Sequence, residues 1–199
     1  MRDAENIRDV ELLKPDLMGF ICWQGSKRNV ASAPLYLPRC TRVGVFVNPD
    51  IEYVLGKVKQ LKLNLIQLHG DESSLLCKTI HEQTGLPIIK AISISNVQDL
   101  QKAKEYEGEA CIDRFLFDTK CDCVGGCGVT FDWNILQEYR GNKHFLLAGG
   151  IDIEHAASIK ALYRSIPQMD GVDLNSRFEL SPAIKDIEKL KRMIELLRE

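Results

Sequence analysis

The chain has 199 residues, with 26 Lys and Arg against 28 Asp and Glu, and its formal net charge is −2. This balance argues against the basic stripe that nucleic acid requires and against a polybasic segment for anionic lipid. No run of about 18 apolar residues could span a membrane, and the first residues lack the apolar stretch of a secretory signal. We therefore expect one cytoplasmic domain over residues 1–199, with no nucleic-acid or membrane partner.

The chain opens with a segment of helical period, Arg2–Leu13, which ends just before Pro15. Short apolar runs typical of buried strands then alternate with amphipathic segments typical of helices. The runs are Leu17–Trp23, Arg42–Val47, Asn64–Leu68, Pro87–Ile92, Arg114–Asp118, His144–Ala148 and Asp170–Leu174. The predicted helices between and after them are Asp50–Leu61, Glu72–Thr84 with Asp71 as its N-cap, and Ile184–Leu197.

This alternation predicts the α/β class, with a parallel sheet covered by helices. An open doubly wound sheet and a closed (β/α)8 TIM barrel both fit it. Successive runs start 22 to 30 residues apart, and so regular a repeat favours the barrel. Only seven strands are visible, and no strand precedes the opening helix. We expect a barrel that lacks its first strand, whose two unpaired strand edges favour a homodimer.

Candidate site residues follow the runs, because the active site of a βα barrel lies at the C-terminal ends of its strands. Gly149-Gly150 and Asn175-Ser176 follow the sixth and seventh runs. Glycine N–H groups beside a helix start suit a phosphate, although Gly-Gly is equally typical of a tight turn. Asp118 ends the fifth run, where a carboxyl group in a partly apolar mouth could deliver a proton; the alternatives are an N-cap or a partner for Lys120.

Two further polar residues are candidates on the same argument. Arg28 could bind a carboxylate through its planar fork, or it could be a solvated loop residue. His69 could line the site or only orient its turn. Three of the seven cysteines, Cys121, Cys123 and Cys127, have C-x-C-x3-C spacing without a fourth close ligand. We therefore expect no metal site there, but free thiols that are prone to oxidation.

Six strings of residues occur together in a characteristic order. They are Val43–Asn48, Gln67–Glu72, Asp118-Thr119-Lys120, Gly125-Gly126-x-Gly128 followed by Phe131-Asp132-Trp133, Leu147–Gly150 and Gly171-Val172-Asp173. In this order and spacing the chain resembles the phosphoribosylanthranilate isomerase family of tryptophan biosynthesis, over essentially its whole length. Each string is weak alone, but their joint order is specific.

The resemblance implies an Amadori rearrangement of the substrate phosphoribosylanthranilate. An acid protonates the ring oxygen and opens the furanose to a Schiff base. A base removes the proton at C2′, and the enolamine becomes the 1-deoxyribulose 5-phosphate aminoketose. Only protons are transferred, so the resemblance implies neither a cofactor nor a metal.

The resemblance also assigns roles to residues of this sequence. Asp118 matches the family's general acid. Arg28 matches the arginine suited to the anthranilate carboxylate, Asp173 an aspartate near the anthranilate amine, and His69 a histidine that lines the site. The phosphate loops match Gly149, Gly150, Asn175 and Ser176.

Two departures from the family pattern affect the expected activity. The family's base is a cysteine in a Lys-Ile-Cys-Gly string directly before a Met-Arg-Asp-Ala-Glu-Asn motif, and here that motif begins at Met1. Cys22 is the nearest thiol, but it matches a position usually held by a large apolar residue. Arg177 stands where glycine commonly follows Ser176. We therefore expect impaired activity; the alternatives are another phosphosugar-binding barrel or a catalytically inactive remnant.

Overall fold

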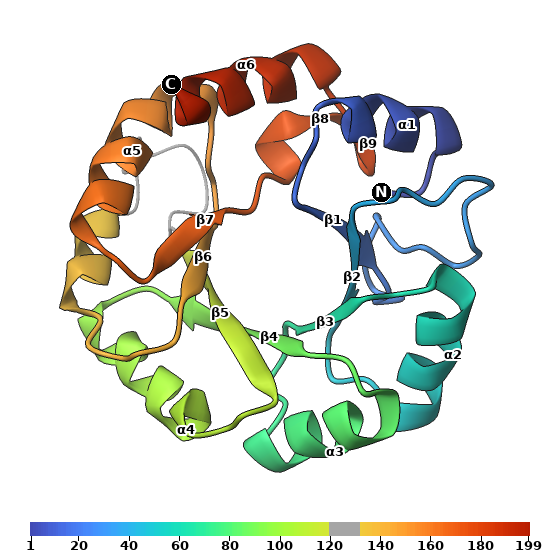
Figure 1. Cartoon of the computed structure of the whole chain (residues 1–199), viewed down its shortest axis with the longest axis horizontal. Coiled ribbons are helices and arrows are strands. Elements are labelled where there is room, and N and C mark those ends of the chain that lie inside the picture. Colours follow the sequence, from blue (N-terminus) through green and yellow to red (C-terminus); the bar gives the residue numbers. More distant parts are fainter. Residues whose placement is uncertain (120–131) are drawn as a thin grey trace.

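The computed structural model describes residues 1–119 and 132–199. Seven parallel strands form one curled sheet in which each strand pairs with its neighbours in chain order (Figure 1). They are β1 (Leu17–Ile21), β2 (Thr41–Phe46), β3 (Leu65–Leu68), β4 (Ile88–Ile94), β5 (Ile112–Thr119), β6 (Phe145–Ala148) and β7 (Met169–Val172). Every apolar run of the sequence analysis forms a strand, and the predicted ends differ from these bounds by at most two residues.

Helices surround this sheet on its outer side (Figure 1). The α-helices are α1 (Ala4–Leu12), α2 (Ile51–Leu61), α3 (Ser74–Thr84), α4 (Lys104–Glu107), α5 (Ala156–Ser165) and α6 (Ile187–Arg198). The 3-10 helices are η1 (Val97–Ala103), η2 (Trp133–Glu138), η3 (Ile153–His155) and η4 (Ser176–Phe178). A two-stranded hairpin of β8 (Glu179–Ser181) and β9 (Ile184–Lys185) precedes α6.

The two faces of the curled sheet bury different side chains, because successive residues of a strand point to opposite faces. The outer face packs on the helices and forms the large apolar core, which includes Phe46, Ile66, Ile88 and Phe115. The inner face forms a second, smaller cluster. Its buried members are Val43, Leu65, Ile89, Ala91, Leu116, Leu146 and Ala148. The inner face therefore carries apolar side chains along the middle of the strands and polar residues at their C-terminal ends.

The sheet has a gap between its first and last strands. Within residues 1–119 and 132–199, β1 pairs only with β2 and β7 pairs only with β6. This confirms the expected seven strands with unpaired edges. Outside the gap, α1 is tied to β9 through Asn6, whose side-chain amide both donates to and accepts from the main chain of Lys185.

Three predicted helix starts are wrong. The opening helix α1 begins at Ala4 rather than Arg2, with Asp3 as its N-cap. Ser73, not Asp71, caps α3, because its hydroxyl accepts the N–H of Leu76. The terminal helix begins at Ile187 rather than Ile184, with Asp186 as its N-cap. The apolar period at Ile184 belongs instead to the short hairpin strand β9.

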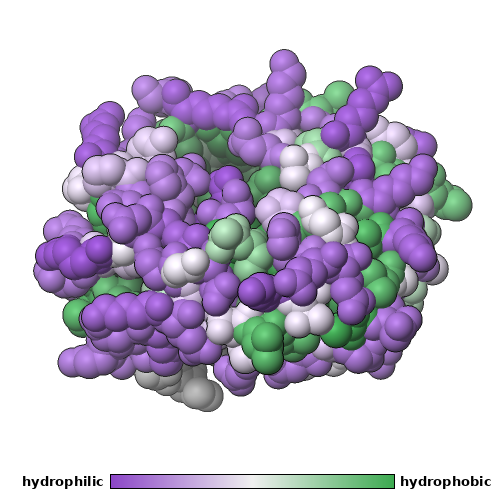
Figure 2. Space-filling model, turned by 60° about the horizontal axis from the view of Figure 1, so that its bottom comes forward, coloured by the Kyte–Doolittle hydropathy of each residue, from purple (hydrophilic) through white to green (hydrophobic). Residues whose placement is uncertain are grey.

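The surface is largely hydrophilic on the face shown in Figure 2, with apolar side chains scattered among polar ones. Isolated exposed apolar residues such as Leu35 and Leu180 are ordinary on a folded domain. None of the helices that the structure describes is both long and apolar enough to cross a bilayer.

Candidate functional site

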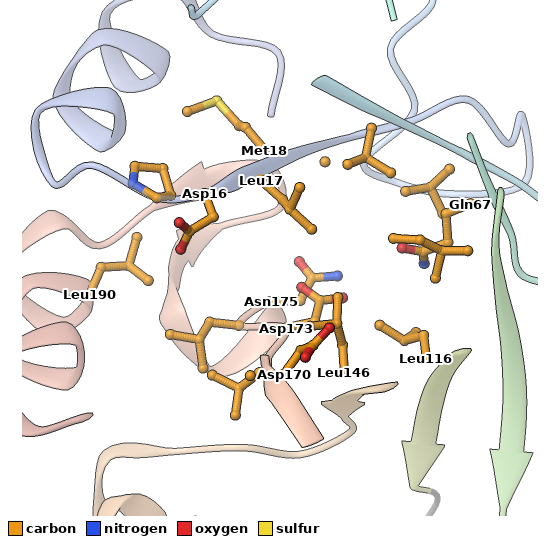
Figure 3. Close-up of a pocket in the computed structure, with 18 of the residues that line it drawn as sticks. Asp16, Leu17, Met18, Gln67, Leu116, Leu146, Asp170, Asp173, Asn175 and Leu190 are labelled. Atoms are coloured by element: carbon orange, nitrogen blue, oxygen red, sulfur yellow. The ribbon is translucent and has the colours of Figure 1, made fainter. Parts of the chain in front are cut away.

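A cavity of about 1200 Å³ runs along the inner face of the sheet beside the gap. Its walls reach from Asp16 and Asp170 at the N-terminal ends of the strands to Arg28, His69 and Asp173 at the C-terminal ends. Figure 3 shows Leu116 and Leu146 lining it from the inner face, with Gln67, Asp173 and Asn175 around the same space. The predicted site residues Arg28, His69, Asp173 and Asn175 therefore share one cavity.

His69 and Asp118 meet across the barrel mouth. Both side chains point to the inner face. Leu65 and Leu116 are inner-face residues, and His69 and Asp118 lie an even number of residues after them along the same strands. Nε2 of His69 lies 3.2 Å from Oδ2 of Asp118. The strand between them, β4, has the small residue Ser93 in register with Asp118, which leaves room for this approach.

Gln67 sets the tautomer of the neutral His69 ring. Its amide nitrogen lies 2.9 Å from Nδ1 of His69. Because an amide nitrogen can only donate, Nδ1 accepts, and a neutral ring carries its proton on Nε2. That N–H donates to Oδ2 of Asp118, which orients the carboxyl group, and among the described residues none hydrogen-bonds to Oδ1.

Asp173 lies at the end of β7, and its main-chain N–H donates to the carbonyl of Leu147. Burial raises the pKa of this carboxyl group, while the positive charge of Lys185 and the nearby His69 lower it in part. Asp118 also acts on Asp173 and raises its pKa. These effects show that His69 and Asp118 are close enough to Asp173 to influence it electrostatically.

Arg28 does not project freely into the cavity but is bound to Glu179 of β8. Its Nε lies 2.8 Å from Oε2 of Glu179, and its Nη2 contacts the same oxygen at 2.5 Å. The Glu179 side chain is only 4% exposed. Within the described residues Nη1 of Arg28 makes no hydrogen bond. The guanidinium plane is therefore fixed by Glu179, with one nitrogen left for a ligand.

The two predicted phosphate loops differ in what they offer. Gly149 and Gly150 have φ angles of 98° and 60°, and a Cβ on Gly149 would lie 2.1 Å from the carbonyl oxygen of Thr119. The helix start beyond them is already capped, because Asp152 accepts the N–H of Ile153. An anion here would therefore depend on the glycine main chain and not on that helix start.

The second loop is organised by a lysine. Asn175 and Ser176 are exposed at the start of η4. Lys185 of β9 donates to both the main-chain and the side-chain oxygen of Asn175, each at 3.0 Å. The ammonium of Lys185 therefore lies against the loop and adds positive charge that suits a phosphate.

Sequence reasoning missed Gln67, Glu179 and Lys185. Gln67 could have been found, because it precedes His69 by two residues and so faces the same side of the strand. Glu179 is 151 residues from Arg28, and no local pattern signals such a pairing. Lys185 was placed in the terminal helix, which concealed its role beside Asn175.

The described cysteines are Cys22, Cys40, Cys77 and Cys111, all free thiols. Burial raises the pKa of Cys22 to about 11 and that of Cys77 to about 12. Such thiols stay protonated near neutral pH and make poor bases. The cluster of Cys121, Cys123 and Cys127 lies outside the described residues. Among the residues described, no three His, Cys, Asp or Glu side chains are grouped to hold a metal ion.

Comparison with known proteins shows the family of this chain. A family model described as N-(5'phosphoribosyl)anthranilate (PRA) isomerase matches residues 3–196. A curated relative of that name from Phocaeicola vulgatus is 46% identical, over 100% of this chain and 95% of its own. One from Parabacteroides distasonis is 43% identical, over 98% of this chain and 89% of its own.

Solved structures agree with this match. The crystal structure of phosphoribosyl anthranilate isomerase from Thermotoga maritima superposes with a TM-score of 0.82 at 29% identity, covering 100% of this chain and 95% of that one. A second isomerase structure, in complex with reduced 1-(o-carboxyphenylamino)-1-deoxyribulose 5-phosphate, gives a TM-score of 0.78 at 28% identity. It covers 100% of this chain and 98% of that one.

Proposed function

Because this chain belongs to the N-(5′-phosphoribosyl)anthranilate isomerase family, we propose that it catalyses the family's Amadori rearrangement in tryptophan biosynthesis. The substrate is N-(5-phosphoribosyl)anthranilate, and the product is the 1-deoxyribulose 5-phosphate aminoketose. The observation that carries this proposal is the meeting of His69 and Asp118 at the C-terminal ends of parallel strands, where βα barrels perform chemistry. The reaction transfers only protons, and the cytoplasm is its proposed location.

Asp118 acts as the general acid in this proposal. His69 holds Oδ2 of Asp118, so Oδ1 carries the proton that is delivered to the ring oxygen of the furanose. Protonation breaks the C1′–O bond and gives the open-chain Schiff base. A correctly placed acid or base contributes about 10²–10⁴-fold to such a reaction.

Three groups hold the substrate at its polar ends. Nη1 of Arg28 binds the anthranilate carboxylate while Glu179 keeps the guanidinium plane fixed. The amine N–H of the anthranilate donates a hydrogen bond to a carboxyl oxygen of Asp173. The phosphate lies between the Gly149-Gly150 loop and the Asn175-Ser176 loop, close to the ammonium of Lys185. The anion completes its hydrogen bonds with main-chain N–H groups.

The base that removes the C2′ proton is not among the thiols that the structure describes. Cys22 is 2% exposed, its Sγ contacts the carbonyl of Phe20, and its pKa is raised to about 11. A buried, protonated thiol cannot accept the proton efficiently. Because the cysteine base that the family resemblance implies matches no residue of this sequence, and Cys22 does not replace it, we propose that these 199 residues bind the substrate but convert it slowly on their own.

Calorimetric titration with reduced 1-(o-carboxyphenylamino)-1-deoxyribulose 5-phosphate, called the reduced aminoketose phosphate below, tests the proposal without requiring turnover. We expect saturable binding at one site per chain, and competition by inorganic phosphate only at much higher concentration. Arg140→Ala provides a matched control, because the Arg140–Glu138 ion pair is exposed. Failure of the parent chain to bind this compound, or equal competition by ribose 5-phosphate, would contradict an anthranilate-specific site.

A homodimer is a further part of the proposal. A structure among the solved relatives concerns monomers made from a dimeric isomerase of Thermotoga maritima, so dimers occur in that protein. Within the described residues β1 and β7 each pair with only one strand. On β1 the N-terminal amine of Met1 already donates to the carbonyl of Gly19, and the N–H of Val30 donates to that of Ile21. A second copy could satisfy the remaining edge groups. Light scattering after size-exclusion chromatography measures the mass directly, and a single monomeric species at high concentration would contradict it.

A further inference from the structure

A lysine and a glutamate form a buried ion pair outside the cavity. Lys90 of β4 lies on the outer face of the sheet, between Ile88 and Ile92, and is 2% exposed. Glu72, which follows β3, is also 2% exposed. Nζ of Lys90 lies 3.1 Å from Oε2 of Glu72. Burying two charges is costly unless both are paired and fully hydrogen-bonded. The hydrogen bonds of this pair therefore show which parts of the main chain it holds in place.

The pair binds the main chain just after the C-terminal ends of β2 and β3 and in the middle of β4. Oxygens of Glu72 accept the N–H of Asn48 at 2.8 Å and the N–H of Gly70 at 3.0 Å. Nζ of Lys90 donates to the carbonyl of Gly70 at 2.7 Å and to that of Ala91 at 3.0 Å. Both polar groups of Gly70 are therefore held by the ion pair.

Gly70 directly follows His69, so the pair restrains the turn that carries the imidazole. A Cβ at Gly70 would lie 2.4 Å from Oδ1 of Asn48, so the turn packs closely against the end of β2. Main-chain N–H of His69 donates to the carbonyl of Phe46, and Tyr106 holds the main-chain carbonyl of Glu72. Each hydrogen bond limits the position of the His69 backbone relative to its neighbouring strands.

We propose that Glu72 and Lys90 are positioning residues that hold His69 in line with Asp118. The inference deepens the proposed function and rests on it, because it assigns the cause of the His69–Asp118 geometry. The pair touches no part of the cavity wall and acts through the main chain of Gly70. If His69 and its turn shift, the acid loses its oriented oxygen while Arg28 and the phosphate loops remain in place.

The test compares Glu72→Gln with Glu107→Gln. Glu107 is a matched control, because its carboxylate also accepts two main-chain N–H groups, those of Asn142 and Lys143, but in the turn before β6. Nitrogen NMR reports the tautomer of His69, and hydrogen exchange reports the protection of the Gly70 N–H. We expect Glu72→Gln to lose the Nε2–H preference of His69 and at least 10-fold of the Gly70 protection, with Glu107→Gln unchanged in both.

Turnover supplies a second readout with a distinct signature. Glu72→Gln should lower kcat at least 10-fold, with affinity for the reduced aminoketose phosphate changed by less than about twofold. If Glu72→Gln does not fold, the double variant Glu72→Leu/Lys90→Met removes both charges and is measured in the same way. An unchanged His69 tautomer and unchanged Gly70 protection in the folded variant would overturn the inference. The His69 tautomer and the Gly70 protection are both measured without turnover, so they test this inference independently of the proposed function.

Discussion

Nε2 of His69 lies 3.2 Å from Oδ2 of Asp118, although the two residues are 49 positions apart in the chain. The sheet brings them together, because His69 follows β3 and Asp118 is the penultimate residue of β5, with β4 between them. Both side chains are partly exposed, at 29% and 22%, so a ligand in the barrel mouth can reach them. Among the described residues only His69 hydrogen-bonds to this carboxyl group, at Oδ2, and a carboxyl group oriented in this way is suited to transfer a proton in a fixed direction.

The stability of the protein should depend on pH through Asp173. Burial raises the folded-state pKa of this group, whereas an unfolded aspartate has a pKa of about 3.9. Between these values the folded state binds more protons, so the free energy of unfolding falls as pH rises through this range. We expect Asp173→Asn to be more stable than the parent at pH 7, with the difference vanishing below about pH 4.

Denaturant unfolding at several pH values measures this effect, and Asp152→Asn provides a control of opposite sign. Burial alone would raise the pKa of Asp152, but Lys189 and the N–H of Ile153 lower it overall. Its carboxylate therefore stabilises the fold above the unfolded pKa and loses that contribution as pH falls. An Asp173→Asn variant less stable than the parent at pH 7 would contradict the assigned shift.

Gly149 should tolerate no side chain. Its φ of 98° is unfavourable for L residues, and a Cβ would lie 2.1 Å from the carbonyl oxygen of Thr119. We expect Gly149→Ala to destabilise the fold by about 1–3 kcal/mol or more and to weaken phosphate binding. Gly56→Ala in α2, where nothing lies within 4 Å, should instead stabilise by about 0.5–1 kcal/mol. Equal unfolding free energies for the two variants would contradict this account of the loop.

Arg28 should be sensitive even to a conservative change. Arg28→Lys keeps the charge but loses the planar fork that Glu179 fixes through two nitrogens. We expect affinity for the reduced aminoketose phosphate to fall at least 10-fold in Arg28→Lys, and to fall less in Glu179→Gln, where Arg28 itself remains. Calorimetry compares them with Arg140→Ala. Parent-like binding by Arg28→Lys would show that another group holds the carboxylate.

The sequence predicts the strands well because their apolar runs are continuous and each lies between segments of helical period. It also orders the residues around the barrel mouth, since His69 follows such a run, Asp118 ends one and Asp173 is the penultimate residue of another. It fails where two local signals compete. Asp71 looks like an N-cap, but Ser73 caps α3, which frees Glu72 to be buried beside Lys90. Arg28 and Glu179 are 151 residues apart in the chain and meet only in the folded protein. No local sequence pattern could have predicted this pair.

A strand carrying a thiol should restore turnover. Joining a short segment ending in Ile-Cys-Gly before Met1 would place a cysteine beside the free edge of β1 and supply the base. We expect the rate to rise by orders of magnitude over that of the 199-residue chain. The same segment with serine in place of cysteine should give an equal melting temperature but little of the rate. Equal turnover by the unextended chain would refute the assignment, and Cys22→Ala would then be the next variant.

The most direct test of the account is the rate of phosphoribosylanthranilate isomerisation by the cysteine-extended chain with and without Asp118→Asn. The substitution preserves shape and removes the transferable proton. We predict that kcat falls by about 10²–10⁴-fold, because a general acid contributes on that order, while affinity for the reduced aminoketose phosphate stays within a few fold. A kcat within about twofold of the unsubstituted protein would contradict the assignment of Asp118 as the acid.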